Sequence, residues 1–165
     1  MSEPIESAAR GVNLGWSLAL VLRRWHEAVE EVLADIPHGT RGYHILGVVA
    51  HECPPTQGAL ATRLVIDRSV LTYLLDDLET AGLLRRVPDR KDRRVRRIIA
   101  TEKGRAILAD AEQRVATAEE VVLSALPPEQ RELFRAAAGQ AAVALHAQDP
   151  TTDPCVAVEI ALSDR

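Results

Sequence analysis

Aromatic and sulfur-containing residues are scarce in this 165-residue chain. Phe, Tyr and Trp together make up 3% of it, and it has two cysteines and one methionine. Cys53 and Cys155 lie far apart and form no Cys-x-x-Cys or Cys/His ligand spacing, which disfavours a disulfide-stabilised secreted domain. We therefore expect a protein of the reducing cytoplasm, with no metal site and no redox role that the context of either cysteine predicts.

Long apolar runs are missing as well. The first ten residues, MSEPIESAAR, are acidic and polar, which does not fit a signal peptide, and the longest apolar stretches are shorter than the roughly 18 to 20 residues that span a bilayer. We expect a soluble chain with no membrane partner. The sequence also has no Gly-rich phosphate loop, no G-x-S-x-G and no H-E-x-x-H, so we expect neither an enzyme nor a cofactor.

Ala and Leu, in contrast, are abundant, and 47% of the residues are hydrophobic, which favours a mostly helical single domain over residues 1–165. Apolar residues at steps of three and four predict an amphipathic helix over 13–36, and proline and glycine end it in IPHG. The same spacing predicts helices over 102–126 and 128–146. The first helix and the one over 102–126 are about twice the ordinary length and carry more apolar surface than one small lobe covers, so we expect 13–36 and 102–146 to bury their stripes against a second copy.

The segment between these long helices has the spacing of a small lobe over residues 40–100. A helix over 40–51 is followed by two short helices that Thr56 and Asp67 can cap, the second with Leu71, Leu74, Leu75 and Leu78 as its buried face. Two β-branched segments then flank PDRKDRR, which predicts a hairpin with a long charged tip. This order is typical of a helix-turn-helix with a β-hairpin wing. Residues 147–165 are too ambiguous to assign.

Positive charge is concentrated in the wing. Residues 85–104 hold nine cationic and three acidic side chains, which leaves 11 Lys and Arg against 21 Asp and Glu in the rest of a chain of net charge −4. Such a cluster gains affinity for duplex DNA by releasing counterions from the phosphates. The tip residues that could supply this charge are Arg90, Lys91, Arg93 and Arg94, with Arg85, Arg86, Arg96 and Arg97 on the strands.

Residues 56–108 together resemble the MarR family of winged-helix transcriptional regulators. The matching features are LATRLVIDRSVLTYLLDDLETAGLLRR as helix-turn-helix, Asp92 to Arg94 as the D-x-R wing motif, and ATEKG where the family usually has Leu-Thr-x-x-Gly. Ala100 replaces the usual Leu, and Tyr73 stands where many members carry a polar residue. The resemblance implies a homodimer that binds a pseudopalindromic operator, more often as a repressor than as an activator.

The resemblance also implies residue roles. Arg94 enters the minor groove, and Asp92 orients it through a salt bridge. From their place on the third and fourth helices we expect Arg68, Ser69, Thr72 and Tyr73 to read bases, and Thr56 and Gln57 to contact phosphates. The family resemblance further implies a small effector, often an anionic aromatic, between the long helices and the lobe, where the candidates are Trp16, Trp25, His26, Tyr43 and His44.

Three alternatives stay open. The lobe could be a winged-helix protein-interaction module that does not bind DNA. The chain could sense metal, since His38, His44, His51 and Cys53 lie near one another in the sequence, although the helix over 102–126 offers no His or Cys. It could also sense oxidants through Cys53 or Cys155. The operator, the regulated genes and the effector are not readable from the sequence.

Overall fold

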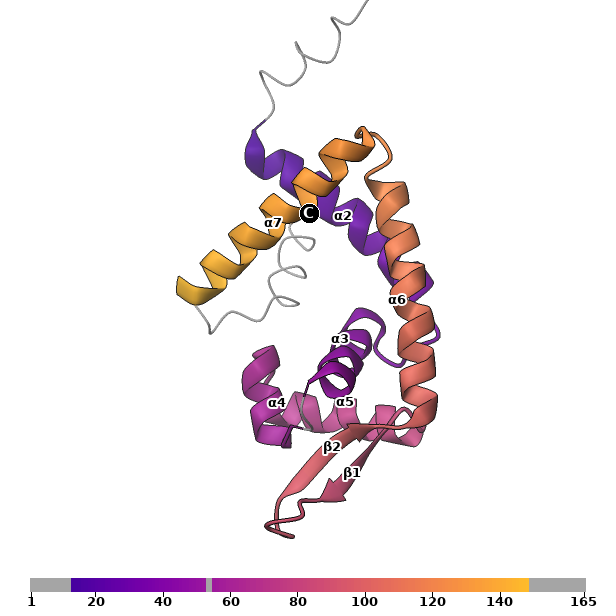
Figure 1. The fold of residues 1–165 in the computed structure, drawn as a ribbon, viewed down its shortest axis with the longest axis vertical. Helices are drawn as coiled ribbons and strands as arrows, with labels where there is room; N and C mark the ends of the chain where they lie inside the picture. The colour runs from indigo at the N-terminus through magenta and orange to yellow at the C-terminus, as the bar shows by residue number, and fades with distance from the viewer. Residues whose placement is uncertain (1–12, 53–54, 149–165) are drawn as a thin grey trace, which may run out of the picture.

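The computed structural model describes residues 13–52 and 55–148, and it is mainly helical with one two-stranded antiparallel hairpin (Figure 1). The predicted fold class is therefore confirmed. The elements in chain order are α2 (Leu14–Val32), α3 (Gly39–His51), α4 (Gln57–Leu64), α5 (Arg68–Thr80), β1 (Leu84–Pro88), β2 (Arg96–Ala100), α6 (Glu102–Val122) and α7 (Pro128–Gln148). Of the unassigned tail 147–165, residues 149–165 lie outside the described residues.

Three predicted N-caps are confirmed in the lobe, and each satisfies backbone N–H groups that a helix start leaves unpaired. The Thr56 hydroxyl accepts from Ala59 N at 3.1 Å, and the Asp67 carboxylate accepts from Ser69 N at 2.8 Å and Val70 N at 3.3 Å. The Thr101 hydroxyl accepts from Gly104 N at 2.9 Å. The chain therefore begins α4, α5 and α6 where its short polar side chains stand.

The lobe has one core, in which α3, α4, α5 and the hairpin meet the first half of α6. The four leucines predicted for α5 are buried, which confirms its inner face. Helix α3 buries Ile45, Leu46 and Val49, and the hairpin contributes Leu84 and Ile98. In the hairpin Leu84 pairs with Ala100, and Pro88 pairs with Arg96. This register fixes how the wing extends from the core.

The first long helix is shorter than predicted, because it ends at Val32 and not at Ile36. Leu33 and Ile36 are then joined by a turn, with a 3.0 Å hydrogen bond from Ile36 N to Leu33 O, and both side chains are buried. The guanidinium of Arg114, on α6, donates to the Val32 carbonyl and to the Asp35 carboxylate, so it caps this helix end from outside.

The helix over 102–126 is also shorter than predicted and ends at Val122. Two consecutive prolines follow at 127 and 128, and a residue before proline is disfavoured in the helical conformation. The chain therefore leaves the helix early and makes a turn before α7 begins at Pro128.

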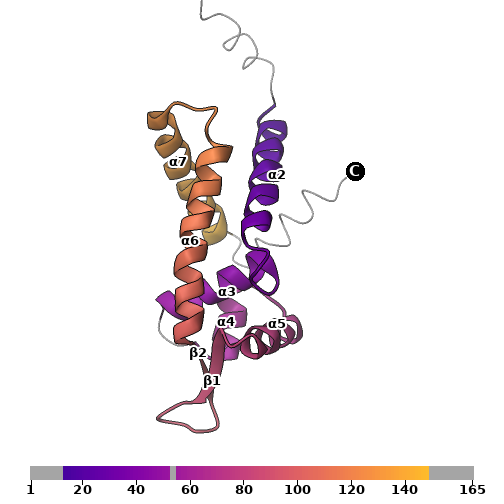
Figure 2. The same cartoon turned by 90° about the vertical axis from the view of Figure 1, so that its right-hand side faces the viewer.

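The expectation that the long helices bury their stripes against a second copy stays a prediction, but much of the α6 stripe is already covered within the chain. Its Leu108, Ala111, Val115 and Ala118 are buried within the chain, and α2 lies along it (Figure 2). The apolar residues of α7 and of the first half of α2 remain exposed, including Leu14 at 73% and Leu133 at 68%. These two helices therefore carry most of the exposed large apolar residues, and Val121 near the end of α6 is exposed as well. Among the described residues, every helix is too short or too polar to cross a membrane.

Candidate nucleic-acid interface

The helix-turn-helix is formed by α4 and α5, which a tight turn joins. Val65 takes a left-handed conformation with φ 55°, and Ile66 N donates to Ala61 O at 3.0 Å across the turn. Two short helices joined by such a turn are the layout of a helix-turn-helix, in which the second helix lies in a groove of DNA and the first crosses its backbone. Position 65 is unusual for a β-branched residue, and no glycine marks the turn in the sequence.

The predicted base readers lie on the solvent side of α5. Arg68, Ser69, Thr72 and Tyr73 are all exposed, and the four buried leucines occupy the opposite side of the helix. The exposed fraction of Tyr73 is 62%, which is high for an aromatic side chain. The structure therefore brings these four residues together on one accessible surface.

Two of the residues predicted to contact DNA, Gln57 and Thr72, form a hydrogen bond with each other. The side-chain amide of Gln57 donates to the Thr72 hydroxyl at 2.5 Å, and this hydroxyl donates to the Arg68 carbonyl at 2.8 Å. Thr56 is engaged as the cap of α4 and forms an isolated bridge with Arg97 of β2. The start of α4 thus contacts α5 through the Gln57 side chain and the wing through the backbone at Thr56.

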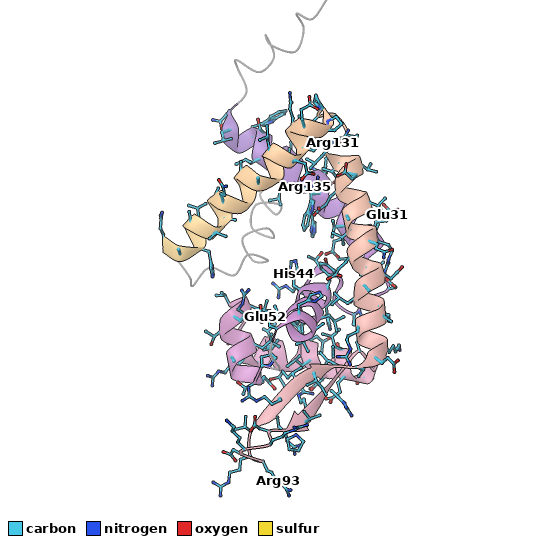
Figure 3. The ribbon with its side chains drawn as sticks, viewed as in Figure 1. Glu31, His44, Glu52, Arg93, Arg131 and Arg135 are labelled. Carbon is cyan, nitrogen blue, oxygen red and sulfur yellow. The ribbon has the colours of Figure 1, made fainter. Side chains whose placement is uncertain are left out.

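The four predicted cationic residues of the wing tip are exposed, and Figure 3 shows Arg93 at the far end of the hairpin. Their loop is folded around the Asp89 carboxylate, which accepts from Lys91 N at 2.7 Å and Asp92 N at 3.2 Å. Asp89 also pairs with Nε of Arg97 at 2.6 Å. The Arg97 hydrogen bond, followed by the two backbone N–H groups, lowers the pKa of Asp89 to about 2.

The expected salt bridge between Asp92 and Arg94 is not the contact that forms. The Asp92 carboxylate accepts from the backbone N–H of Arg94 at 3.0 Å, and within the described residues no ion pair joins the two side chains. Asp92 therefore shapes the loop and leaves the Arg94 guanidinium exposed. Sequence reasoning missed Asp89 as the main brace of the wing, although an aspartate directly before a charged loop is a usual position for such a turn.

Two arginines of the cationic segment are engaged inside the protein. Arg86 pairs with Asp76 at 2.7 Å and with Glu79, and its side chain is only 21% exposed. Arg97 pairs with Asp89 in the wing. Of the eight arginine and lysine residues considered for phosphate contact, these two instead connect the hairpin to α5 and to its own tip.

The effector candidates do not form one site. Trp25 lines a cleft of about 580 Å³ between α2, α6 and α7, where its Nε1 donates to Glu119 at 3.0 Å. Trp16 is 62% exposed, His26 is half-buried on α2, and neither lines the cleft. Tyr43 and His44 stack obliquely on α3 with ring centroids 5.7 Å apart. Burial, then Glu112 and Glu119, raise the pKa of Tyr43.

Two of the three histidines considered as metal ligands have carboxylate partners. His38 lies 2.8 Å from Asp77, and His51 lies 2.6 Å from Glu112. Over residues 13–52 and 55–148 no group of three or more His, Cys, Asp or Glu could hold a metal ion. Cys53 and Cys155 lie outside the described residues.

Comparison with known proteins places these features in context. Residues 42–95 match the model of the MarR family. An uncharacterised HTH-type transcriptional regulator of Bacillus subtilis (strain 168), YybA, is 28% identical over 98 residues, which are 59% of this chain and 65% of YybA. The aligned part of the chain thus spans about 65% of the length of that relative.

Solved structures are similar over more of the chain. The fold matches wild-type MarR from E. coli with a TM-score of 0.67 at 21% identity, over 79% of this chain and 97% of that one. The transcriptional repressor CouR bound to a 23-mer DNA duplex is 29% identical with a TM-score of 0.69, over 79% and 92%. CouR from Rhodococcus jostii RHA1 bound to p-coumaroyl-CoA is 31% identical with a TM-score of 0.61, over 76% and 88%.

Proposed function

Because the chain belongs to the MarR family of winged-helix transcriptional regulators, we propose that it binds a specific duplex DNA sequence as a homodimer and represses transcription until an effector releases it. The observation that carries this proposal is the placement of the exposed face of α5 and the cationic wing tip on one lobe. A helix of this kind reads base edges in the major groove, and a cationic hairpin beside it reaches the phosphates or the minor groove.

The wing supplies most of the electrostatic attraction in this proposal. Arg90, Lys91, Arg93 and Arg94 are exposed at its tip, whereas Asp76 and Asp77 place negative charge on α5. Arg94 enters the minor groove, and Asp92 and Asp89 hold the loop that presents it. Because the loop is folded before binding, less conformational entropy is lost when it meets DNA.

The face of α5 supplies the base contacts. Arg68, Ser69 and Tyr73 point to solvent from its first two turns, and Thr72 is held by Gln57. In this proposal Gln57 holds α4 against α5, Thr56 caps α4, and the backbone N–H groups at the start of α4 approach a phosphate. The side chains of Thr56 and Gln57 therefore act mainly through structure.

The exposed apolar surface of α2 and α7 fits a second copy of the chain. Leu14 and Leu18 on α2, with Leu133 and Leu145 on α7, are all more than half exposed. Four such residues on two adjacent helices form a surface that a two-fold interface buries on both subunits at once. A symmetric dimer presents two recognition helices, which fits a pseudopalindrome with half-sites about one helical turn apart.

The effector site in this proposal is the cleft beside Trp25. Its volume of about 580 Å³ suits a small molecule, and its walls are mostly apolar residues of α2, α6 and α7. The relative that binds p-coumaroyl-CoA supports an effector in general. The one cationic lining residue, Arg135, already pairs with Glu120 and Glu132, so the lining itself gives an anionic aromatic no special advantage.

The experiment that tests the proposal is a fluorescence-anisotropy titration of promoter fragments from the source genome at two salt concentrations. Wild type should bind one fragment with a Kd of about 10⁻⁸ M or tighter, and binding should weaken as salt rises. Arg94→Ala should lose at least about 1 kcal/mol and reduce the salt slope by about one. Arg24→Ala, which removes an exposed charge from α2 far from the wing, is the matched control and should bind as wild type does.

Absence of salt-sensitive binding to every fragment would refute the proposal. The winged lobe would then be a module that binds another protein through its surface, because such binding depends mainly on apolar contact and little on salt. If wild type binds DNA and Arg94→Ala binds it equally well, the proposed regulatory function stands, but the role proposed for the wing is refuted.

A further inference from the structure

One imidazole connects the turn before α3 to two successive turns of the proposed recognition helix. His38 lies between α2 and α3, and its Nε2 is 2.8 Å from a carboxylate oxygen of Asp77. The same ring makes a T-shaped contact with Tyr73, with ring centroids 5.3 Å apart and planes at 66°. Tyr73 and Asp77 are four residues apart on α5 and therefore lie on one side of it. The His38 side chain is 23% exposed, so it is largely enclosed by these contacts.

The backbone at His38 is in a conformation that is uncommon outside glycine. Its φ is 66°, in the left-handed region, where Asn, Asp and His are the non-glycine residues found most often. A non-glycine residue stays there only when its surroundings compensate the cost, and here the compensating contacts are those with α5.

The other side of this turn is fastened to α2. The Glu30 carboxylate accepts from Thr40 N at 3.1 Å and from the Thr40 hydroxyl, so a side chain of α2 caps the start of α3. Gly39 has φ 52°, which strains other residues, and a Cβ there would lie 2.4 Å from a Glu30 oxygen and displace the carboxylate that caps α3. His38 therefore projects to α5 from a turn that α2 holds in place.

We propose that His38 is a positioning residue for DNA recognition: it orients the Tyr73 ring on the DNA-facing side of α5 and ties α5 to the end of α2. The proposal rests on the proposed DNA-binding function, because it assigns His38 an effect on affinity through Tyr73. Without an aromatic neighbour, a 62% exposed tyrosine samples several rotamers, and fixing one of them costs affinity when DNA binds. The His38 contact lowers that cost before DNA arrives.

A double-mutant cycle on the DNA fragment that wild type selects tests this role. His38→Asn keeps a residue that tolerates the left-handed backbone but is too short to reach α5. It should weaken DNA binding about fivefold to tenfold, with no change in the salt slope, because no phosphate contact is lost. In a Tyr73→Ala background the same substitution should change affinity less than twofold, because the ring that His38 orients is gone.

Asp77→Ala removes the other partner of the His38–Asp77 contact, and the test is whether this variant binds DNA more weakly or more tightly than wild type. Removing a negative charge from a DNA-facing helix strengthens binding if only electrostatics acts. Our proposal predicts about threefold or more weaker binding, because His38 loses the partner that holds its ring against Tyr73. Asp76→Ala removes an equal charge from the same helix without touching His38. It breaks one ion pair of Arg86, which keeps its pair with Glu79, so this control should bind as tightly as wild type or more tightly.

The outcomes separate this inference from the function on which it rests. If wild type binds no DNA, both fail. If wild type binds and His38→Asn weakens binding equally with and without Tyr73, the residue acts only through general structure and the inference is overturned. The same holds if Tyr73→Ala leaves affinity unchanged or if Asp77→Ala tightens binding. Each Kd is corrected for the folded fraction measured by circular dichroism, so that an unstable variant still reports on the cycle.

Discussion

We predict that replacing Gly104, the glycine of the ATEKG segment, lowers the stability of the fold. Gly104 is the third residue of α6, and a Cβ on it would lie 1.9 Å from the carbonyl oxygen and 2.8 Å from the carbonyl carbon of Leu83. The same oxygen accepts from Thr101 N at 3.0 Å and from the Thr101 hydroxyl at 3.2 Å. The start of α6 is therefore pressed against the chain that enters β1, backbone against backbone.

Gly104→Ala should destabilise the fold despite improving helix propensity. Alanine in a helix is about 1 kcal/mol more favourable than glycine, whereas overpacking a core costs about 1 to 3 kcal/mol. The cost at Gly104 falls at or above the top of that range, because the opposing atoms are backbone and cannot rotate away. We expect a net loss of about 2 kcal/mol, or about 4 to 8 °C in Tm for a chain of this size.

The assay is urea and thermal unfolding followed by circular dichroism at one fixed protein concentration, since an oligomer makes Tm concentration-dependent. Gly47→Ala is the matched control, because Gly47 lies inside α3 and a Cβ there would meet nothing within 4 Å. That variant should be as stable as wild type or more stable by up to about 1 kcal/mol. Equal unfolding midpoints for Gly104→Ala and wild type would refute the close approach from which the prediction is drawn.

Three further predictions concern the wing and its attachment. Arg86→Ala should lower the unfolding midpoint and leave the salt slope of DNA binding unchanged, whereas Arg94→Ala should lower the slope by about one, as parallel unfolding and anisotropy experiments would reveal. The carboxyl of Asp89 should titrate near pH 2 by NMR, and its pKa should shift toward the ordinary value in Arg97→Gln. Because its folded pKa is depressed, its stabilising effect is complete above about pH 4 and is lost as the pH falls toward 2, so Asp89 should hold the wing loop equally well over pH 5 to 8. Thr101→Ala should cost about 1 kcal/mol in urea unfolding, because the cap of α6 and its bonds to the Gly82 and Leu83 carbonyls are lost together.

Local patterns in the sequence predict most of the lobe. Thr56, Asp67 and Thr101 begin their helices as expected, because N-capping depends on a few adjacent residues. The leucines of α5 follow one helical stripe, and the β-branched segments around PDRKDRR form the hairpin. These features involve neighbours within a few positions of the chain, so the residue types alone indicate them.

Features that depend on distant residues are not predictable in this way. Helix α2 ends at Val32, and its last carbonyl accepts a hydrogen bond from Arg114, 82 positions away. The apolar stripe of α6 has a spacing that suits a partner subunit as well as a neighbouring helix of the same chain, and the fold uses the second. Periodicity shows which face of a helix is apolar and does not show what covers it.

In the cationic segment, too, local sequence predicts one property and distant contacts decide another. Its charge is evident from composition, but the pairing of Arg86 with Asp76 and Glu79 arises because β1 folds back beside α5. His38 was considered as a metal ligand and is instead a neighbour of α5. Which cations stay exposed for DNA is thus decided by tertiary contacts.

The measurement that tests the central claim most directly is a hydroxyl-radical footprint of wild type on the DNA fragment it binds most tightly. A symmetric dimer with two recognition helices and two wings predicts two protected segments related by a two-fold axis, with centres about 10 base pairs apart. It also predicts that Arg94→Ala loses protection at the outer edges of both, where the wings lie. A single unsymmetrical protected segment, or uniform cleavage at protein concentrations that saturate binding, would contradict the account.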